Sequence, residues 1–522
     1  MEKRLLLFLV VLSAVMVAPT PQHGSAMAEL LQSDGFIVPS LVFTTVVTST
    51  ISVVSKAVSL VSNFTAAFGD FRLSNALSDC VDLLALSSDQ LSWTLSAAQT
   101  GESNGTGRIL SDMKTWLSAA LVNQDTCVDG FEGTNSFVKE QIAGSLSQVT
   151  SLVLKAINML PETPGPEKSN NGGSKGGGRK LLMGGRDESF PSWVIPKDRE
   201  LLQTAGVRTA DVVVAADGTG NFTTVTDAVA AAPDYSTRRF VIYIRRGVYE
   251  ENVEIKRKKS NIMVFGDGMD ATIITGSRSY LDGWTTYRTA TFGSGFIARD
   301  LTIENTAGPQ KQQAVAFRSD SDLSALYRCA FRGYQDTLYA HTNRQFYREC
   351  TITGTVDFMF GNAVAVFQSC QILAKKGLPN QKNTVTAQGR KEQEDVSGFS
   401  VQFCNITADS DLLQGPANST YTYLGRPWKQ YSRTIFMQSY IGAVVRPEGW
   451  LEWSEGMFLD TLFYAEYMNF GPGAAVGSRV QWPGYHVFNG SDQAIKFTVA
   501  EFIDGNSWLP QTGVTFSAGL EA

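Results

Sequence analysis

Two aspartates, Asp336 and Asp357, have the type and spacing to carry out acid–base or nucleophilic chemistry. They are 21 residues apart, and Cys329 and Cys350, seven residues before each aspartate, repeat that separation. A period near 20 residues, with an apolar residue two places after each cysteine, is typical of successive coils of a parallel β-helix. Equivalent residues of adjacent coils stack at about 4.8 Å, so the repeat predicts that the two carboxyl groups lie side by side.

Like charges at that separation cannot both ionise at low free-energy cost, so one carboxyl group retains its proton while the other stays anionic. The aspartate pair therefore predicts an acid and a nucleophile made from one residue type. A pair of carboxylates also occurs in retaining glycosidases, so the pair alone does not choose between ester and glycoside hydrolysis.

Other residues could complete a site for acyl transfer to or from a sugar acid. The side-chain amides of Gln335 and Gln313 can donate hydrogen bonds to a developing oxyanion. Arg426 can hold one carboxylate ionised through a bidentate pair. Trp428 and Trp450 offer flat faces on which a sugar ring can stack. Each also has a structural interpretation, since a glutamine can satisfy backbone groups and a tryptophan can belong to the core.

Other catalytic classes find little support in the sequence. The chain has three histidines and no G-x-S-x-G motif, so a Ser-His-Asp hydrolase is poorly supported. No spacing of His or Cys resembles a metal site, and we expect neither a metal nor an organic cofactor. A formal charge of −6 argues against a nucleic-acid partner.

The sequence after residue 208 predicts the solenoid that would position the site. Short β-rich runs between Gly, Asn and Asp are expected at 212–215, 240–244, 261–265 and 272–275. A repeated element of the form Cys/Leu-x-Ile/Phe follows at 301, 329, 350, 370 and 404. Stacking of these positions favours disulfides between Cys329 and Cys350 and between Cys370 and Cys404. The alternative is that they are buried free thiols that pack as small hydrophobic groups.

The sequence before that point predicts three further segments. Residues 1–28 read as a signal peptide, with a signal anchor as the alternative. Residues 29–160 carry amphipathic helical periodicity, and the apolar stretch from Gly35 to Ser55 is expected to be a helix of a bundle. Residues 161–208 read as a Pro- and Gly-rich linker with a dibasic sequence at 179–182. Six N-x-[ST] sequons and six cysteines are in keeping with a secreted glycoprotein.

Several long motifs of the second half resemble the signature blocks of plant pectin methylesterases. These are Gly333-Tyr-Gln-Asp-Thr-Leu338, Gly354-Thr-Val-Asp-Phe-Met-Phe-Gly361 and Leu424-Gly-Arg-Pro-Trp428. The resemblance covers residues 209–522. It implies a right-handed parallel β-helix, an all-β fold, that hydrolyses the C6 methyl esters of homogalacturonan without a cofactor and modifies the plant cell wall as a secreted enzyme.

The same resemblance assigns roles to individual residues. Asp357 is the expected nucleophile and Asp336 the general acid and then base. Gln335 and Gln313 are expected to stabilise the oxyanion, and Arg426 to orient Asp357. Trp428 and Thr286 match positions that contact substrate.

The first half is similar to the pectin methylesterase inhibitor fold, an all-α four-helix bundle that serves as a pro-region. Cys80 and Cys127 match the second disulfide of that fold, whereas the cysteine pair of its N-terminal hairpin is missing here. By analogy, residues 179–182 would be cut by a subtilisin-like processing protease. Pectin is the expected substrate, separate inhibitor proteins are possible partners, and a monomer is expected.

Two rival functions accompany this interpretation. One is a glycoside hydrolase on the same scaffold, and the other is a non-catalytic wall-binding or inhibitor protein. Methanol release would separate the esterase from the glycosidase, which would produce new reducing ends. An altered Asp336, Asp357 or Arg426 would favour the non-catalytic protein, and all three are present.

Overall fold

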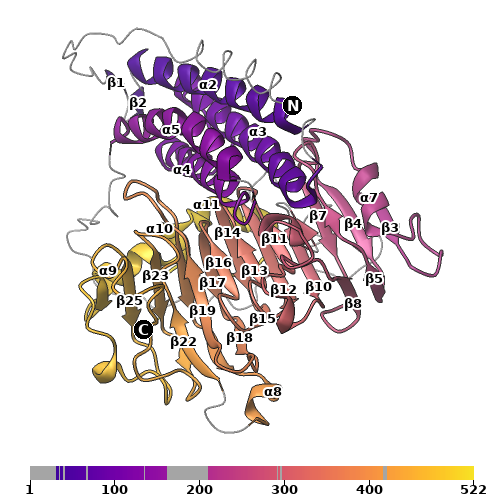
Figure 1. Ribbon diagram of the computed structural model, residues 1–522, viewed down its shortest axis with the longest axis vertical. Helices are drawn as coiled ribbons and strands as arrows, with labels where there is room; N and C mark the ends of the chain where they lie inside the picture. The colour runs from indigo at the N-terminus through magenta and orange to yellow at the C-terminus, as the bar shows by residue number, and fades with distance from the viewer. Residues whose placement is uncertain are drawn as a thin grey trace, which may run out of the picture.

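The computed structural model describes residues 31–33, 36–38, 41–65, 69–134, 136–161, 210–290, 292–293, 297–415 and 420–521. The predicted signal peptide and the dibasic sequence at 179–182 lie outside these residues. Within them, helices dominate before residue 161 and parallel strands dominate after residue 210. The two parts pack against each other, with the helices lying along one side of the strands (Figure 1).

The N-terminal part contains a bundle of long helices: α2 (Leu41–Thr65), α3 (Phe71–Thr100), α4 (Ile109–Asp129) and α5 (Ser136–Asn158). A short antiparallel pair, β1 (Leu31–Ser33) and β2 (Phe36–Val38), precedes it. Asp70 begins α3 by accepting a hydrogen bond from Leu73 N, and Gly101 ends it in the left-handed conformation. Helix α2 is long and apolar enough to cross a membrane, but its residues enter the bundle core, as the sequence predicts.

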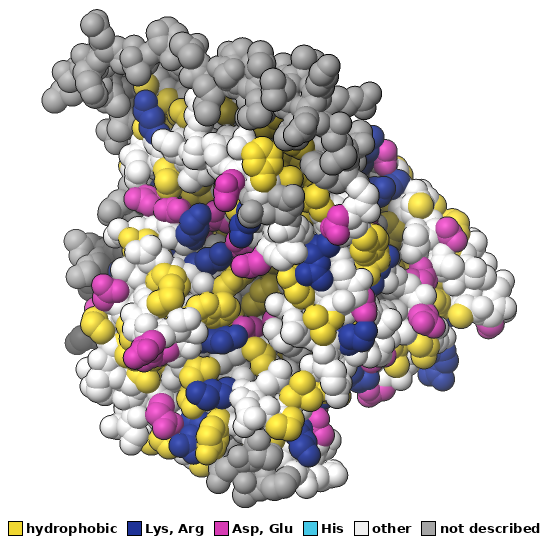
Figure 2. Space-filling model, in the orientation of Figure 1, with side chains coloured by type: hydrophobic (Ala, Val, Ile, Leu, Met, Phe, Trp, Pro, Cys, Tyr) yellow, Lys and Arg dark blue, Asp and Glu magenta, His cyan; other side chains and the backbone are white. Residues whose placement is uncertain are grey.

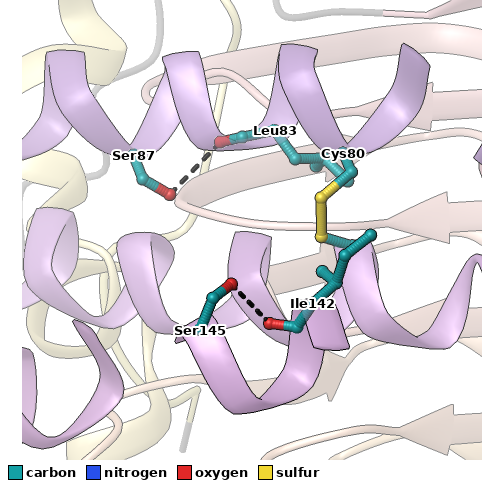
Figure 3. The surroundings of a disulfide bond; sticks show 6 residues. Cys80, Leu83, Ser87, Ile142 and Ser145 are labelled. Carbon is teal, nitrogen blue, oxygen red and sulfur yellow. Dashed lines mark hydrogen bonds between the residues drawn. A yellow bond between two sulfur atoms is a disulfide. The ribbon is translucent and has the colours of Figure 1, made fainter. Parts of the chain in front are cut away.

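One disulfide joins the bundle helices. Cys80 of α3 and Cys127 of α4 are bonded, which confirms the pairing that the family resemblance implies (Figure 3). Nearby, Ser87 donates a hydrogen bond to Leu83 O and Ser145 donates one to Ile142 O, each within its own helix.

The C-terminal part is a parallel β-helix with three faces. The first face contains β3 (Val212–Val214), β4 (Phe240–Ile244), β7 (Ile262–Phe265), the first half of β10 (Ile297–Asn305) and of β12 (Ser324–Arg332), β14 (Arg344–Arg348), β17 (Val364–Gln368), β20 (Gly398–Gln402), β23 (Arg433–Met437), β25 (Phe463–Tyr467) and β26 (Tyr485–Val487). The strands β10 and β12 bend into the next face, because each pairs with two strands of a neighbouring coil.

The second face continues from those bends. It contains β5 (Gly247–Glu250), β8 (Thr272–Gly276), the second halves of β10 and β12, β15 (Thr351–Gly354), β18 (Gln371–Ala374), β21 (Asn405–Ala408) and β24 (Tyr440–Ile441). Its register stacks the apolar member of each predicted repeat, from Ile303 through Phe331, Ile352 and Ile372 to Ile406. The repeat read from the sequence is therefore confirmed.

The third face carries the motifs that could do chemistry. It contains β6 (Val253–Glu254), β9 (Phe292–Gly293), β11 (Phe317–Ser319), β13 (Leu338–Ala340), β16 (Met359–Gly361), β19 (Lys382–Gln388) and β22 (Tyr421–Gly425). Short helices cover other parts of the solenoid: α7 (Val225–Ala231), α8 (Ser410–Leu413), α9 (Ser491–Ala494), α10 (Val499–Phe502) and α11 (Gly505–Trp508).

The interior of the solenoid is an apolar column. Aromatic rings stack from coil to coil, for example Tyr347 on Phe367 with centroids 4.7 Å apart and Trp450 on Tyr464 with centroids 4.2 Å apart. The predicted disulfides of this part are wrong. Cys329, Cys350, Cys370 and Cys404 are all buried free thiols.

The register explains why these cysteines do not pair. Side chains at equivalent positions of adjacent parallel strands point in the same direction, so their Cβ atoms keep the inter-strand spacing of about 4.8 Å. A disulfide needs Cβ atoms about 3.5–4.5 Å apart. The thiols therefore stack as small hydrophobic groups, which is the alternative that the sequence left open.

Candidate active site

Asp336 and Asp357 occupy equivalent corners of two adjacent coils. Each precedes a strand of the third face, and the pairing of Leu338 with Met359 carries the same 21-residue offset. Asp336 N donates to Val356 O at 3.0 Å, so the ladder continues through the corner. Both aspartates have a left-handed backbone, with φ of 60° and 51°. Such a conformation is unfavourable for a residue with a side chain and is often found at functional sites.

Arg426 holds the carboxylate of Asp357 in a bidentate ion pair. Its Nε donates to Oδ1 at 2.8 Å and its Nη2 donates to Oδ2 at 2.6 Å. The Thr384 hydroxyl donates to Oδ1 at 2.6 Å and also accepts a hydrogen bond from Asp357 N at 2.9 Å. Oδ1 therefore receives two hydrogen bonds and Oδ2 receives one. The less saturated Oδ2 is the better placed of the two to attack an electrophile.

Asp336 has a different environment. Burial raises the pKa of its carboxyl group well above the ordinary value of 3.8, the negative charge of Asp357 raises it further, and Arg426 opposes both effects. Within the described residues, no hydrogen bond to this carboxyl group compensates for its burial. Arg426 thus pairs with one of the two carboxyl groups, and the neighbouring group favours the protonated form. The spacing predicts different roles for the two groups, and their surroundings differ.

The predicted glutamines lie on the neighbouring coils. Gln335 precedes Asp336 directly and is half-buried, and its backbone carbonyl accepts a hydrogen bond from Ala314 N, the residue after Gln313. The side-chain oxygen of Gln313 is buried without a hydrogen-bond partner among the described residues. That amide oxygen is therefore not used to satisfy the backbone, which was the structural alternative for this residue.

The two tryptophans singled out from the sequence have different positions. Trp428 is half-buried and lies edge-on to Phe360 with centroids 6.0 Å apart. Trp450 is only 1% exposed and belongs to the core, so the interpretation of Trp450 as a sugar platform is wrong.

Two residues of the site were not singled out from the sequence. Trp453 lies under the Arg426 guanidinium, with 4.3 Å from Cζ to the ring centroid, and supports it by a cation–π contact. Thr384 lies one coil beyond Asp357, but an insertion lengthens the register offset between β16 and β19 to 27 residues. The 21-residue period therefore could not reveal Thr384.

The helical bundle packs against the face that carries these residues. Its core cluster includes residues of the β-helix, among them Tyr339, Phe360 and Ala387, with Trp428 at its edge. Thr126 of α4 is hydrogen-bonded to the His341 ring at 2.8 Å, and this histidine is completely buried.

Contacts with the bundle also lie beside Thr286, Gln313 and Trp428. Beside Thr286, Arg288 is paired with Asp79. Tyr280 links Gln313 to the bundle. Its backbone N–H donates to the Gln313 carbonyl, and its own carbonyl accepts a hydrogen bond from Arg72 of α3 at 2.5 Å. Next to Trp428, Lys429 is paired with Asp129. Figure 2 shows side chains of both charges gathered where the bundle meets the β-helix. The bundle thus covers the surroundings of the aspartate pair on several sides.

Comparisons with known proteins agree with this geometry. The Pectinesterase family model matches residues 211–506, and the Plant invertase/pectin methylesterase inhibitor model matches residues 26–159. Pectinesterase/pectinesterase inhibitor PPE8B of Prunus persica is 59% identical over 99% of this chain and 96% of its own length. Probable pectinesterase/pectinesterase inhibitor 32 of Arabidopsis thaliana is 56% identical over 98% of this chain and 97% of its own length.

A solved structure supports the fold of the second part. Pectin methylesterase from carrot is 52% identical, with a TM-score of 0.59, and the match covers 61% of this chain and all of that one. The chain belongs to the pectinesterase family, with a parallel β-helix esterase domain behind a helical domain of the pectin methylesterase inhibitor type.

Proposed function

We propose that the chain hydrolyses the C6 methyl esters of homogalacturonan to pectate and methanol, with Asp357 as the nucleophile. The observation that carries this assignment is the bidentate hold of Arg426 on Asp357, beside a second carboxyl group whose pKa is raised. An ionised carboxylate and a protonated one at adjacent positions supply what ester cleavage needs.

The first half-reaction releases methanol. Oδ2 of Asp357 attacks the ester carbonyl carbon, and the amides of Gln335 and Gln313 donate hydrogen bonds to the oxyanion that forms. When the oxyanion collapses, the bond to the methoxy group breaks and Asp336 donates its proton to that oxygen. Methanol leaves, and the galacturonate acyl group remains joined to Asp357 as an anhydride.

The second half-reaction restores the enzyme. Asp336, now ionised, takes a proton from water as the water attacks the anhydride. Cleavage returns Asp357 as a carboxylate and leaves a free galacturonate carboxyl group on the polymer. Arg426 stabilises the departing Asp357 carboxylate in this step, because its two donors match the two carboxylate oxygens.

We further propose that the helical bundle is an inhibitory pro-region. Residues 1–28 would direct export to the cell wall, and cleavage at residues 179–182 by a subtilisin-like protease would separate the two domains. The contacts of α3 and α4 around the substrate residues support this proposal, because a polymer could not reach the aspartate pair past them. Separate inhibitor proteins with the fold of the bundle would bind the third face of the β-helix and compete there with the polymer.

The reaction class is tested with residues 209–522 and highly methylated pectin. Two products are measured on the same samples: methanol, and new reducing ends. We expect methanol without new reducing ends. Reducing ends without methanol would assign the carboxylate pair to glycoside hydrolysis and overturn the proposal.

A further inference from the structure

A carboxylate of the bundle is buried against polar side chains of the β-helix, two coils before the strand that Asp336 precedes. Asp79 of α3 is 1% exposed. Its Oδ2 accepts a hydrogen bond from the Thr285 hydroxyl, and its Oδ1 accepts one from Arg288 Nε at 2.5 Å. Thr285 and Arg288 flank Thr286, and all three belong to the turn that leads into β9. The β-helix thus presents a ready set of carboxylate donors at this point.

These donors lie within the reach of a polymer bound at the aspartates. The strand β9 is two coils before β13, the strand that Asp336 precedes. At about 4.8 Å per coil, the separation along the solenoid axis is about 10 Å. A polyuronide lying along the third face would therefore pass these donors one or a few sugars away from the ester being cleaved.

The charge around these donors is unbalanced without the bundle. The guanidinium of Arg278 stacks on Trp284, with 4.1 Å between Cζ and the ring centroid. Burial lowers the pKa of Arg278, and the positive charge of the nearby Arg288 lowers it further. Glu254 is the β-helix carboxylate whose charge acts on both arginines. Two guanidinium groups then face one carboxylate.

Arg318, the other guanidinium close by, has its own partner. It forms an ion pair with Asp320 at 3.0 Å. Asp79 and Glu254 also act on Arg318, so it shares these two carboxylates with Arg288. In the intact chain, Asp79 and Asp82 of the bundle supply the missing negative charge at Arg288.

We propose that Thr285 and Arg288, with Arg278 beside them, bind the carboxylate of a demethylated galacturonate residue once the bundle has left. This inference rests on the proposed function. A galacturonate carboxylate offers the same two oxygens as Asp79, and the reaction itself creates such groups on the polymer. The subsite would favour cleavage of esters near residues that are already demethylated, and Asp79 would act as a stand-in for the product.

Two measurements with residues 209–522 test the subsite. This part can be studied alone, because it has its own core cluster and the carrot structure consists of this part only. The first is the Kd of fully demethylated oligogalacturonate by calorimetry, which needs no turnover. The second is the ratio of KM for fully methylated pectin to KM for partly demethylated pectin.

The informative variant is Arg288→Gln. We expect its Kd for the demethylated oligomer to rise about tenfold or more, because a charge-assisted hydrogen bond is lost. The ratio of KM for fully methylated pectin to KM for partly demethylated pectin should fall, and Arg288→Lys should restore part of the affinity. Glu254→Gln should tighten binding, since it removes the competing carboxylate. Arg332→Gln is the matched control, because Arg332 pairs with the exposed Asp270 and not with the bundle.

The outcomes separate this inference from the proposed function. Methanol release with a Kd that does not depend on Arg288 would overturn the subsite and leave the esterase intact. Binding that depends on Arg288 without methanol release would support the subsite and refute the esterase. An equal loss of affinity in Arg332→Gln would also overturn the subsite, because the effect would then reflect overall charge.

Discussion

The helical bundle and the β-helix meet at a charged seam. Most of the ion pairs across this seam have the carboxylate on the bundle and the cation on the β-helix. Seven ion pairs cross it among the described residues, and six place the carboxylate on the bundle. Only Arg108, which pairs with Asp504, reverses the pattern. The bundle therefore presents carboxylates to the cations of the β-helix along this seam.

The two parts also differ in what stabilises them. The bundle relies on helix packing and on the disulfide between Cys80 and Cys127. The β-helix keeps four stacked cysteines as free thiols and relies on register and on its aromatic column. A covalent link therefore contributes to the stability of the helical bundle, and stacking from coil to coil stabilises the β-helix.

Removing the disulfide between Cys80 and Cys127 should have the largest effect on the difference in stability between the bundle and the β-helix. The bond closes a loop across a sequence separation of 47 residues. Its loss in Cys80→Ser should therefore destabilise the bundle by about 3 to 4 kcal/mol, in the chain-entropy description. Thermal unfolding of the full chain should show an earlier bundle transition and an unchanged β-helix transition. Cys370→Ala is the control in the other domain, and a shift of both transitions in Cys80→Ser would contradict independent stabilisation.

Separating the domains should have the next largest effect. Methanol release by residues 209–522 should exceed that of the full chain by about tenfold or more, because a linked bundle competes at a millimolar effective concentration. Adding the bundle back as a separate chain should reduce the rate. Equal rates for the two forms would show that the cleft stays accessible beneath the bundle.

The raised pKa of Asp336 predicts a smaller effect, on stability within the β-helix. The folded state binds this proton more tightly than the unfolded state, so its contribution is fully present at low pH. It is lost as the pH rises above the ordinary carboxyl range, through the raised pKa. At neutral pH, Asp336→Asn should therefore raise the free energy of unfolding by about 1 kcal/mol, although it removes the acid. The gain should shrink as the pH falls, and a gain that grows would contradict the assignment.

The smallest expected effect concerns the thiols. Under native conditions without reductant, the four β-helix cysteines should resist alkylation because they are buried. In denaturant, four thiols per chain should react, while Cys80 and Cys127 stay bonded. Two or no reactive thiols after unfolding would restore one or both of the disulfides that the spacing suggested.

Much of the β-helix could be predicted from the sequence, because the register between adjacent coils appears in the sequence as a repeat of nearly constant length. Asp336, Asp357 and the stacked apolar ladder followed from one repeat length. The same repeat led to the wrong prediction of disulfides. Stacking brings the cysteines of adjacent coils next to each other, but their side chains stay parallel and do not bond. The interpretation of Trp450 as a sugar platform was wrong because Trp450 lies in the interior column, and the contact of Trp453 with Arg426 was not foreseen.

Features that depend on contacts between distant segments could not be predicted. The charged seam joins α3 and α4 to cations spread over the solenoid, such as Arg257, Arg288 and Lys391, and no local pattern links them. Arg257, for example, pairs with Asp89 of the bundle, which is 168 residues away in the chain. The carboxylate subsite became visible only with Asp79 in place.

Methanol release by residues 209–522 tests the nucleophilic role of Asp357 when wild type is compared with Asp357→Asn. Asparagine keeps the shape of the side chain but removes the nucleophilic carboxylate that Arg426 holds. We predict a fall in kcat of about a thousandfold or more, as for the loss of other catalytic nucleophiles. The control Asp270→Asn, at an exposed aspartate, should keep wild-type activity. Activity of Asp357→Asn within about tenfold of wild type would contradict the account.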